Sequence, residues 1–449
     1  MNERPLHDHS LETLFAPLLA PFKRVVLAVS GGSDSMALMV LAARWIASGQ
    51  APHDLVIDVA TVDHRLRAGS SREADWVADR AKALGFQHTT LVWSGDKPDA
   101  SIQERAREAR YALLAAHARG GAPSAVVTAH TADDQAETLL MRLGRGSGLD
   151  GLSGMAPSRL LLPDGSVHLV RPLLGLSKEQ LAGTLKKTDG AWLDDPSNER
   201  LDFERVRLRM AREHLSALGL SNEKLALSAA RLLRVRDALE QITEARLAAL
   251  VDQHNGVFAS VAQEVWRGEP GEVRVRMLAR LLAAFGGDAK PAQLSQVEAL
   301  EAVLAQGMPF AQTLGGCIVS QGRTTLRLYR EPGHHALPEM MLSRGGEALW
   351  DWRFRVRYEP HQPLEGEGDG EGEAGGAPAP IPQAVSVRPL GLAAYATLKD
   401  GLSPYSRPPA RAAAGLPAFW DGDRLLAVPS LQSDSRFTAQ FLGLKRGTR

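Results

Sequence analysis

Cysteine is nearly absent from this sequence. Cys317 is the only cysteine among 449 residues, so one chain can form neither an internal disulfide nor a Cys-x-x-Cys pair for metal or redox chemistry. Disulfide frameworks belong mainly to secreted proteins, whereas proteins of a reducing compartment rarely need cysteine pairs. We therefore expect a cytoplasmic protein.

Net charge and long apolar runs are absent as well. Lys and Arg total 52, as do Asp and Glu, which leaves no formal net charge, so any surface for nucleic acid must be local. Apolar runs such as residues 24–29 are much shorter than the roughly 18 residues of a membrane span. The polar start, MNERPLHDHS, lacks the apolar core of a signal peptide. The sequence therefore predicts no association with a membrane.

The most informative stretch is a turn near the N-terminus. Residues 24–29 are apolar and rich in β-branched side chains, which indicates a buried strand, and residues 35–45 carry apolar side chains at helical density. The turn between them reads Ser30-Gly31-Gly32-Ser33-Asp34-Ser35. Glycines permit a sharp turn and close approach to a ligand, and N–H groups before a helix form an anion cradle. We predict that this turn binds a phosphate chain.

Two other kinds of turn share residues with this one. An ordinary strand-to-helix turn uses the same residue types, because Ser, Gly and Asp favour turns and helix starts. A P-loop kinase motif requires a Gly-Lys pair before Ser or Thr, and this chain contains no Gly-Lys. The complete six-residue pattern at the end of a first strand favours the phosphate site.

Strands and helices alternate after this turn. Strands are predicted at residues 54–63, 88–93 and 125–130, and helices at about 70–84, 101–119 and 133–143. This order is typical of an α/β fold with a parallel, doubly wound sheet that is covered on both faces. Ligands of such sheets bind at the C-terminal ends of the strands.

Polar clusters follow two of these strands. His64, Arg65 and Arg67 follow the second strand, and His130, Asp133, Asp134 and Glu137 follow the fourth. Acidic residues also favour a helix N-terminus for purely structural reasons, and arginines are often solvated. Because both clusters meet the edge that carries residues 30–35, we interpret them as parts of one site.

Two further segments are rich in arginine. Arg107 and Arg110 share a face of the predicted helix 101–119, where they could also form surface ion pairs with neighbouring glutamates. Arg205, Arg207 and Arg209 lie in a segment with few acidic residues. Guanidinium groups match the geometry of RNA phosphates, although a solvated helix face would have a similar composition.

Several motifs resemble a known family when they are taken together. The turn at residues 30–35 matches the SGGxDS pattern of the PP-loop ATP pyrophosphatases. The motifs VDHRLR at residues 62–67, TAHTADDQAET at 128–138, RGSGLDGLSGM at 145–155, RPLL at 171–174 and DDPSN at 194–198 follow in order. This set resembles the bacterial tRNA(Ile)-lysidine synthases over the first half of the chain. The resemblance implies an adenine nucleotide alpha hydrolase-like fold.

The resemblance also implies a reaction and a site. ATP, bound at Ser30–Ser35, would adenylate C2–O of the wobble cytidine in the CAU anticodon of tRNA(Ile), and the ε-amine of L-lysine would then displace AMP to give lysidine. We expect catalytic roles for Asp34, Arg110, Asp133 and Asp134, with Asp34 and Asp134 as candidate Mg²⁺ ligands. Substrate and tRNA contacts are expected from His64, Arg65, Arg67, Arg107, His130, Glu137, Arg205, Arg207 and Arg209. An oligomer is compatible with these expectations.

The chain length predicts two or three domains. We place the catalytic domain at residues 1–215, a helical domain at 216–330 and a small α/β domain at 331–449. The resemblance implies that the helical domain is a spacer that also binds tRNA. Residues 363–382 consist mainly of Gly, Glu, Pro and Ala without periodicity, which predicts a disordered acidic insertion.

Other classes of function remain as alternatives. Thiolation of tRNA uses the same adenylated base but ordinarily needs paired cysteines or an iron–sulfur cluster, and Cys317 is alone. Amidation of a small molecule would leave the arginine segment, which carries Arg205, Arg207 and Arg209, and the C-terminal domain without a role. A non-catalytic RNA-binding protein would not need the phosphate turn.

Overall fold

The computed structural model describes most of the chain. The described residues are 9–66, 69–95, 102–121, 123–162, 164–188, 190–193, 204–287, 291–359, 382–402, 407–432 and 434–443. They form two compact units that divide between Asp237 and Ala238. Residues 363–381 of the predicted acidic insertion lie outside the described residues, and the division into three domains stays a prediction.

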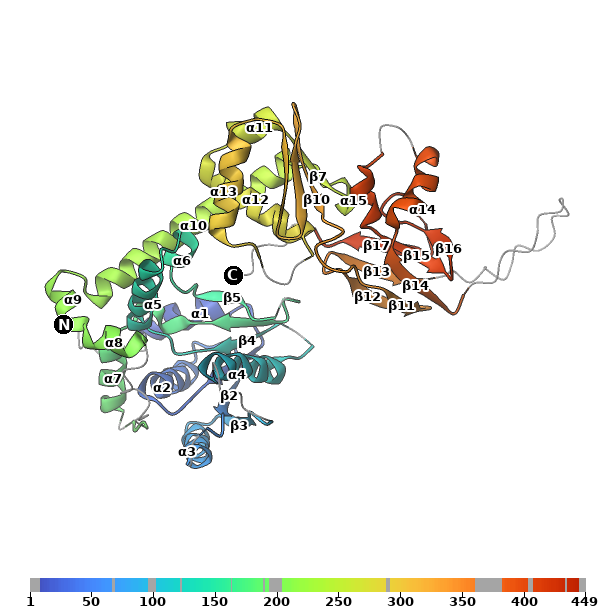
Figure 1. Ribbon diagram of the computed structural model, residues 1–449. Helices are drawn as coiled ribbons and strands as arrows, with labels where there is room; N and C mark the ends of the chain where they lie inside the picture. Colours follow the sequence, from blue (N-terminus) through green and yellow to red (C-terminus); the bar gives the residue numbers. More distant parts are fainter. Residues whose placement is uncertain are drawn as a thin grey trace. The chain divides into compact units, whose positions relative to one another are not determined.

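The first unit is built on a six-stranded sheet (Figure 1). Its central strand β1 (Arg24–Ala28) pairs in parallel with β2 (Val56–Asp63) and β4 (Ser124–Val127). The outer strands are β3 (Gln87–Val92) beside β2, and β6 (Val167–Val170) beside β4, followed by the antiparallel edge strand β5 (Ser158–Leu160). The predicted parallel sheet is confirmed. The short strands β5 and β6 are not predicted from the sequence.

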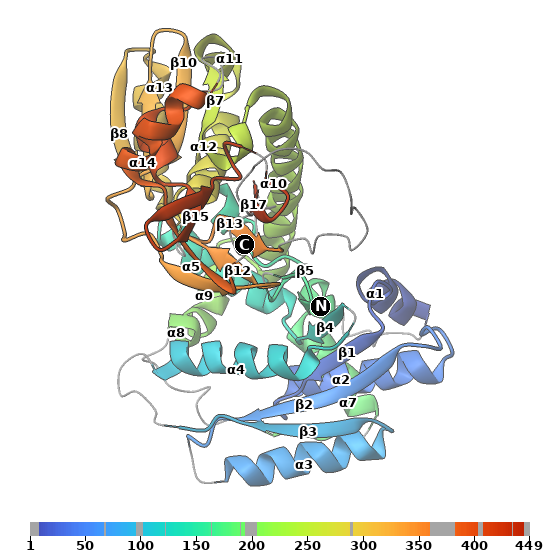
Figure 2. The ribbon, with the colours of Figure 1, turned by 90° about the vertical axis from the view of Figure 1, so that its right-hand side faces the viewer.

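Helices cover both faces of this sheet (Figures 1 and 2). Successive side chains of a strand point to opposite faces, and in β1 Val25 and Leu27 enter one hydrophobic core while Val26 and Ala28 enter another. The first core is closed by α1, α2, α3 and α7, and the second by α4. The helices of this unit are α1 (His9–Leu19), α2 (Ser33–Ala47), α3 (Ser70–Ala83), α4 (Ile102–Ala118), α5 (Ala132–Gly144), α6 (Leu149–Leu152), η1 (Pro172–Gly175), α7 (Lys178–Lys187), α8 (Glu204–Met210), α9 (Arg212–Ala217) and α10 (Asn222–Leu250), which continues past Asp237.

The second unit combines helices with three antiparallel sheets. Its first part packs α11 (Gln263–Gly268), α12 (Gly271–Phe285) and α13 (Leu294–Ala305) with a sheet of β7 (Ala259–Ala262), β8 (Phe310–Leu314), β9 (Cys317–Gln321) and β10 (Thr325–Arg330). A 3₁₀ turn, η3 (His254–Gly256), precedes β7. The sequence predicts the helices of this part but not its sheet, because the strands have only four to six residues.

The rest of the second unit contains the other two sheets. One sheet has the order β11-β14-β15-β16 and the other has the order β12-β13-β17. Their strands are β11 (Met340–Ser343), β12 (Glu347–Trp350), β13 (Phe354–Tyr358), β14 (Ala384–Pro389), β15 (Pro417–Asp421), β16 (Arg424–Ala427) and β17 (Phe437–Phe441), and the helices are α14 (Gly391–Leu398), η4 (Lys399–Gly401) and α15 (Ala410–Ala414). Among the described helices of the whole chain, none has the length and apolar character that a membrane crossing requires.

Candidate active site

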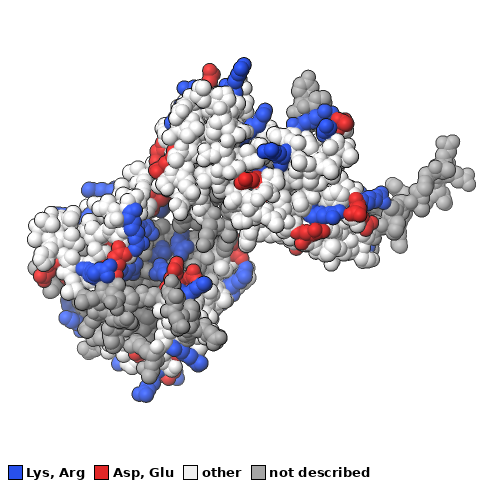
Figure 3. All heavy atoms as spheres, in the orientation of Figure 1, with Lys and Arg blue, Asp and Glu red and all other residues white. Residues whose placement is uncertain are grey.

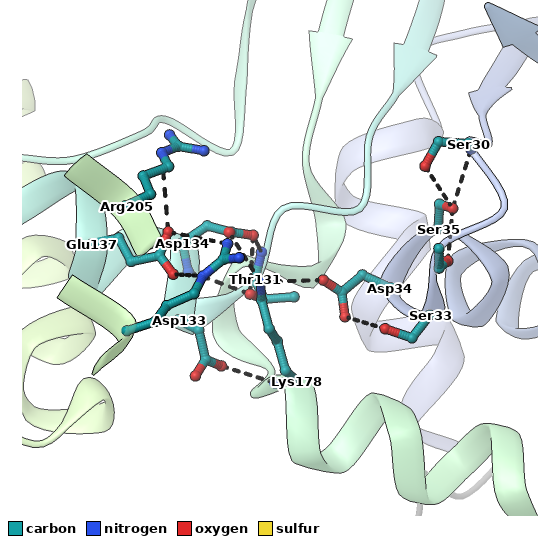
Figure 4. Close-up of polar contacts among 12 residues, drawn as sticks. Ser30, Ser33, Asp34, Ser35, Thr131, Asp133, Asp134, Glu137, Lys178 and Arg205 are labelled. Atoms are coloured by element: carbon teal, nitrogen blue, oxygen red, sulfur yellow. Dashed lines mark hydrogen bonds and ion pairs between the residues drawn. The ribbon is translucent and has the colours of Figure 1, made fainter. Parts of the chain in front are cut away.

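The predicted phosphate turn connects β1 to α2. Gly31 has a φ of 92°, and Ser35 closes the turn because its Oγ donates to Gly32 O (2.9 Å) and accepts from Ser30 N (3.2 Å) (Figure 4). Helix α2 starts at Ser33 without a side-chain cap from Gly32. Its first N–H groups are therefore not taken up by a capping side chain, as an anion site requires.

Gly31 is the residue of this turn that tolerates substitution least. A Cβ there would lie 2.9 Å from Leu193 Cδ1 and 3.3 Å from Val77 Cγ2. We expect Gly31→Ala to cost about 1–2 kcal/mol of backbone strain and to weaken ATP binding about tenfold, since a shift of 1.4 kcal/mol is a factor of ten. Isothermal titration with a non-hydrolysable ATP analogue measures the effect. Gly85→Ala is the matched control, since Gly85 also has a positive φ (84°) but no neighbour within 4 Å. Equal affinities of the two variants would contradict this role of Gly31.

The first turn of α5 presents a carboxylate to the same region. Thr131 caps this helix, and Asp134 Oδ2 accepts hydrogen bonds from Thr131 N (2.9 Å) and Thr131 Oγ1 (3.1 Å). Burial alone would raise the pKa of Asp134, but the Lys178 ammonium and the hydrogen bonds from Thr131 hold it below its usual value. Asp134 is therefore an ionised carboxylate with one oxygen pinned.

Lys178 connects this carboxylate to the phosphate turn. Its Nζ lies 3.5 Å from Asp134 Oδ1 and 3.6 Å from Asp34 Oδ2, as Figure 4 shows. Burial raises the pKa of Asp34 above its usual value, and Asp134 adds to the rise while Lys178 opposes it. The structure thus gathers Asp34 of α2 and Asp134 of α5, as the sequence predicts, around a lysine of α7 that no sequence motif indicates.

Asp133, the other acidic residue of this pair, makes different contacts. Its Oδ2 accepts from Lys178 N (2.8 Å) and its Oδ1 accepts from Asn222 Nδ2 (2.7 Å). Arg212 Nη1 lies 3.8 Å from Asp133 Oδ1. The carboxylate of Asp133 therefore holds the starts of α7 and α10 against α5.

These contacts predict a structural effect of removing the Asp133 carboxylate. A hydrogen bond to a charged group contributes about 1.5–3 kcal/mol, so we expect Asp133→Ala to speed amide hydrogen exchange in α7 about 30-fold, the factor that corresponds to about 2 kcal/mol. Mass spectrometry of exchanged peptides gives the rates. Asp79→Ala, at an exposed position of α3, should leave them unchanged, and an unchanged rate in Asp133→Ala would show that its carboxylate does not hold α7.

Glu137, one turn further along α5, pairs with the arginine segment. It is buried, with 6% of its surface exposed, and its Oε1 accepts from Arg209 Nε (2.7 Å) while Arg205 Nε lies 4.0 Å from Oε2. Arg207 is exposed on the same helix, α8. The structure therefore brings Arg205 and Arg209 to the site, where they neutralise a carboxylate.

A positive cluster surrounds His130, which precedes α5. Burial lowers the pKa of His130 to about 3, so its imidazole is neutral at neutral pH. The guanidinium groups of Arg171, Arg110 and Arg107 contribute to this lowering, and the Asp134 carboxylate opposes it. Arg171 is buried with its Nη1 donating to Ala156 O (2.8 Å). Such a group of guanidinium ions suits a phosphate that gains negative charge.

The residues after β2 form the remaining predicted group. Arg65 is exposed and has a φ of 49°, and its N–H donates to Asp63 Oδ1 (2.9 Å). The ring of His64 packs edge-on against the ring of Trp93, with 5.8 Å between the ring centroids. Arg67 lies outside the described residues. Contacts of these side chains with RNA stay a prediction.

The carboxylates suit a magnesium ion. Among the described residues, no cluster of three or more His, Cys, Asp or Glu side chains could hold a metal alone. Magnesium at phosphate sites typically takes one or two protein carboxylates, together with phosphate oxygens and water. Asp34 and Asp134, which reach a common cation beside the phosphate turn, fit that requirement.

Comparisons with known proteins identify relatives of this chain. The family model of the PP-loop domain matches residues 5–213. A tRNA(Ile)-lysidine synthase of Bradyrhizobium diazoefficiens is 45% identical over 330 residues, which cover 72% of this chain and 89% of the relative. A tRNA(Ile)-lysidine synthase of Ruegeria pomeroyi is 41% identical over 340 residues, or 75% of this chain and 77% of that protein.

Solved structures were compared as well, and one of those that match is a tRNA-modifying enzyme. The U34-tRNA thiolase NcsA from Methanococcus maripaludis with its [4Fe-4S] cluster aligns with a TM-score of 0.41 and 15% identity, over 50% of this chain and 78% of that chain. A likeness at this level carries no information about activity. The sequence relatives, by contrast, are similar over most of their length, which confirms the resemblance seen in the motifs. The chain belongs to the tRNA(Ile)-lysidine synthase family.

Proposed function

We propose that this protein joins L-lysine to C2 of the wobble cytidine in the CAU anticodon of tRNA(Ile), with conversion of ATP to AMP and diphosphate. The product, lysidine, pairs with A rather than G, so the codon read changes from AUG to AUA. The observation that carries the proposal is the meeting of Asp34 and Asp134 beside the phosphate turn in a chain whose relatives are tRNA(Ile)-lysidine synthases.

The first step activates the base. The phosphates of ATP lie over Ser30–Ser35, where the N–H groups at the start of α2 and the hydroxyls of the turn bind their oxygens. The O2 atom of cytidine attacks the α-phosphorus, an O–P bond forms, and the bond to diphosphate breaks. A bound Mg²⁺, held by Asp34 and Asp134, would supply positive charge for the phosphates. Arg107, Arg110 and Arg171 supply fixed positive charge from the side of His130.

The second step transfers lysine. The ε-amine attacks C2 of the adenylated base, a C–N bond forms, and AMP leaves with the former O2 oxygen. Lysine must lose a proton to attack, and a buried carboxylate can accept it. We assign Glu137 to bind this amine, because its carboxylate is buried on the same face of α5 as Asp134 and accepts a hydrogen bond from Arg209.

The RNA is bound through local positive charge. Basic and acidic side chains are interspersed on the face of the molecule in Figure 3, in agreement with the zero net charge. We propose that Arg205, Arg207 and Arg209 of α8, together with His64, Arg65 and Arg67, contact the tRNA backbone around the anticodon. Phosphate contacts of this kind position the RNA and weaken with added salt.

One observation weighs against thiolation. Cys317 is fully buried, and its Sγ contacts Leu282 O at 3.6 Å inside the core of the second unit. It is the only cysteine of the chain, and a buried thiol without a partner cysteine is a poor carrier of sulfur.

An incubation with three substrates tests the proposed function. Purified protein, ATP, radiolabelled lysine and a tRNA(Ile) transcript with the CAU anticodon should give labelled RNA and diphosphate. Diphosphate release with ammonia and a free nucleotide, without RNA, would indicate small-molecule amidation instead. Retention of RNA with neither product would indicate a binding protein. A transcript with a UAU anticodon is the matched control and should remain unlabelled.

A further inference from the structure

Several hydrogen bonds fix the backbone around Lys178. It is the first residue of α7, whose N-cap Ser177 forms a reciprocal capping box with Gln180 (3.2 Å and 3.0 Å). Its own N–H donates to Asp133 Oδ2 (2.8 Å). In addition, Ala132 N at the start of α5 donates to Leu176 O (2.8 Å), just before α7. The start of α7 is therefore fixed beside the start of α5, and the Lys178 side chain extends from this backbone towards Asp34 and Asp134.

The ammonium group of Lys178 is loosely held between its two partners. Its distances of 3.5 Å to Asp134 Oδ1 and 3.6 Å to Asp34 Oδ2 exceed the roughly 2.7–2.9 Å of a charge-assisted hydrogen bond. About a third of the side chain (32%) is exposed. The ammonium thus balances the charge of both carboxylates without a short bond to either one.

The two carboxylates are arranged differently around this cation. Oδ2 of Asp134 is fixed by hydrogen bonds from Thr131 N and Thr131 Oγ1. Oδ1 of the same carboxylate is therefore held in the direction of the Lys178 ammonium. Asp34 belongs to the first turn of α2, directly after the phosphate turn. A cation between these oxygens therefore lies next to the expected phosphates.

We propose that Lys178 is a positioning residue that occupies the divalent-cation site of the nucleotide-free protein and leaves it when the cation arrives with ATP. This inference rests on the proposed assignment of Asp34 and Asp134 as Mg²⁺ ligands. An ammonium and a divalent ion repel each other strongly at short range, so the two cannot share the space between these oxygens. The long lysine side chain lets the displaced ammonium turn to the phosphates, where it binds as a point charge.

The proposal makes an unusual prediction for metal binding. Removing the charge should improve the affinity of the free protein for a divalent ion, since the site loses its competing cation. We expect Lys178→Met and Lys178→Gln to bind Mn²⁺ about tenfold more tightly than the parent protein without nucleotide, a difference of about 1.4 kcal/mol. Electron paramagnetic resonance of free Mn²⁺ during a titration measures this affinity directly.

The matched control is Lys187→Met, at the exposed C-terminal end of the same helix. It should bind Mn²⁺ like the parent, and Lys178→Arg, which keeps the charge, should not bind more tightly than the parent. Circular dichroism establishes that each variant is folded, and two neutral variants are used so that one failure to fold does not decide the result. With ATP present, loss of the ammonium should also raise the KM for ATP about fivefold or more.

The outcomes separate this inference from the proposed function. Unchanged or weaker Mn²⁺ affinity in the folded neutral variants would overturn the role of Lys178, even if the parent protein makes lysidine. Tighter Mn²⁺ binding would support it even if no lysine enters the tRNA, because the titration contains neither RNA nor lysine. A purely structural lysine would not improve metal affinity when it is removed.

Discussion

Asp34→Asn should lower the rate of tRNA-dependent diphosphate release about 10²- to 10³-fold, the effect of removing one preorganised electrostatic contact to a transition state. Asp34 follows the phosphate turn directly and shares the Lys178 ammonium with Asp134. The amide keeps the size of the side chain but removes the negative charge that a divalent ion requires. The rate is measured with a coupled diphosphate assay at saturating ATP, lysine and tRNA.

The control for this variant separates catalysis from folding and from binding of RNA. Asp79→Asn changes an exposed aspartate of α3 in the same unit, and its rate should equal that of the parent protein. Retention of labelled tRNA on a filter should be nearly the same for both variants. Unimpaired diphosphate release by Asp34→Asn would remove Asp34 from the site.

Glu137→Gln should separate the two chemical steps. We expect lysine incorporation to fall about 10²-fold, the lower end of the contribution of a general base, while diphosphate release changes about threefold or less, since the first step does not use this carboxylate. Glutamine retains the size of Glu137 but cannot accept a proton from the amine. Single-turnover reactions with labelled ATP and labelled lysine give the two rates, and adenylated RNA should accumulate in the variant.

Glu137 also pairs with Arg209 and Arg205, so the control must disturb a similar ion pair. Glu179 of α7 accepts from Arg212 Nη2 (2.8 Å), and 55% of its side chain is exposed. Glu179→Gln therefore loosens another ion pair, between α7 and α9, at an exposed position. Both steps should keep their rates in this control. Equal losses in both steps of Glu137→Gln would show that its role is not confined to lysine transfer.

The contiguous parts of the site could be predicted from the sequence. The phosphate turn is six adjacent residues between a strand and a helix, and the predicted parallel sheet brings the end of β4, with Asp134, towards the end of β1. Thr131 and Asp134 even form the capping box that their spacing allows. The geometry of such local motifs depends on neighbouring residues only, so it can be predicted from the sequence.

Contacts between distant segments could not be predicted in the same way. Asp133 bonds to Lys178 and Asn222, which lie 45 and 89 positions further along the chain. The adjacent pair Asp133 and Asp134 therefore divides into a residue that holds helices and a residue that faces the cation. Lys178 itself occupies an ordinary helix start, and no pattern around it indicates that its side chain reaches α2 and α5.

The partners of the arginine segment also could not be predicted from the sequence. Its composition predicted contacts with RNA phosphates, and in the structure Arg209 binds Glu137 at a separation of 72 positions. The charge of an arginine is evident from the sequence, but its partner depends on tertiary packing. The sheet of β7, β8, β9 and β10 was missed for a related reason, since its short strands form only through pairing with each other.

The most direct test of the account is the chemical identity of the wobble nucleoside after reaction. The tRNA(Ile) transcript is incubated with the protein, ATP and isotopically labelled lysine, and then digested to nucleosides for mass spectrometry. The account predicts one labelled lysine joined to the base of the wobble cytidine, with one AMP released for each lysine incorporated. An unmodified cytidine, a sulfur-containing base or lysine attached at another nucleotide would contradict it.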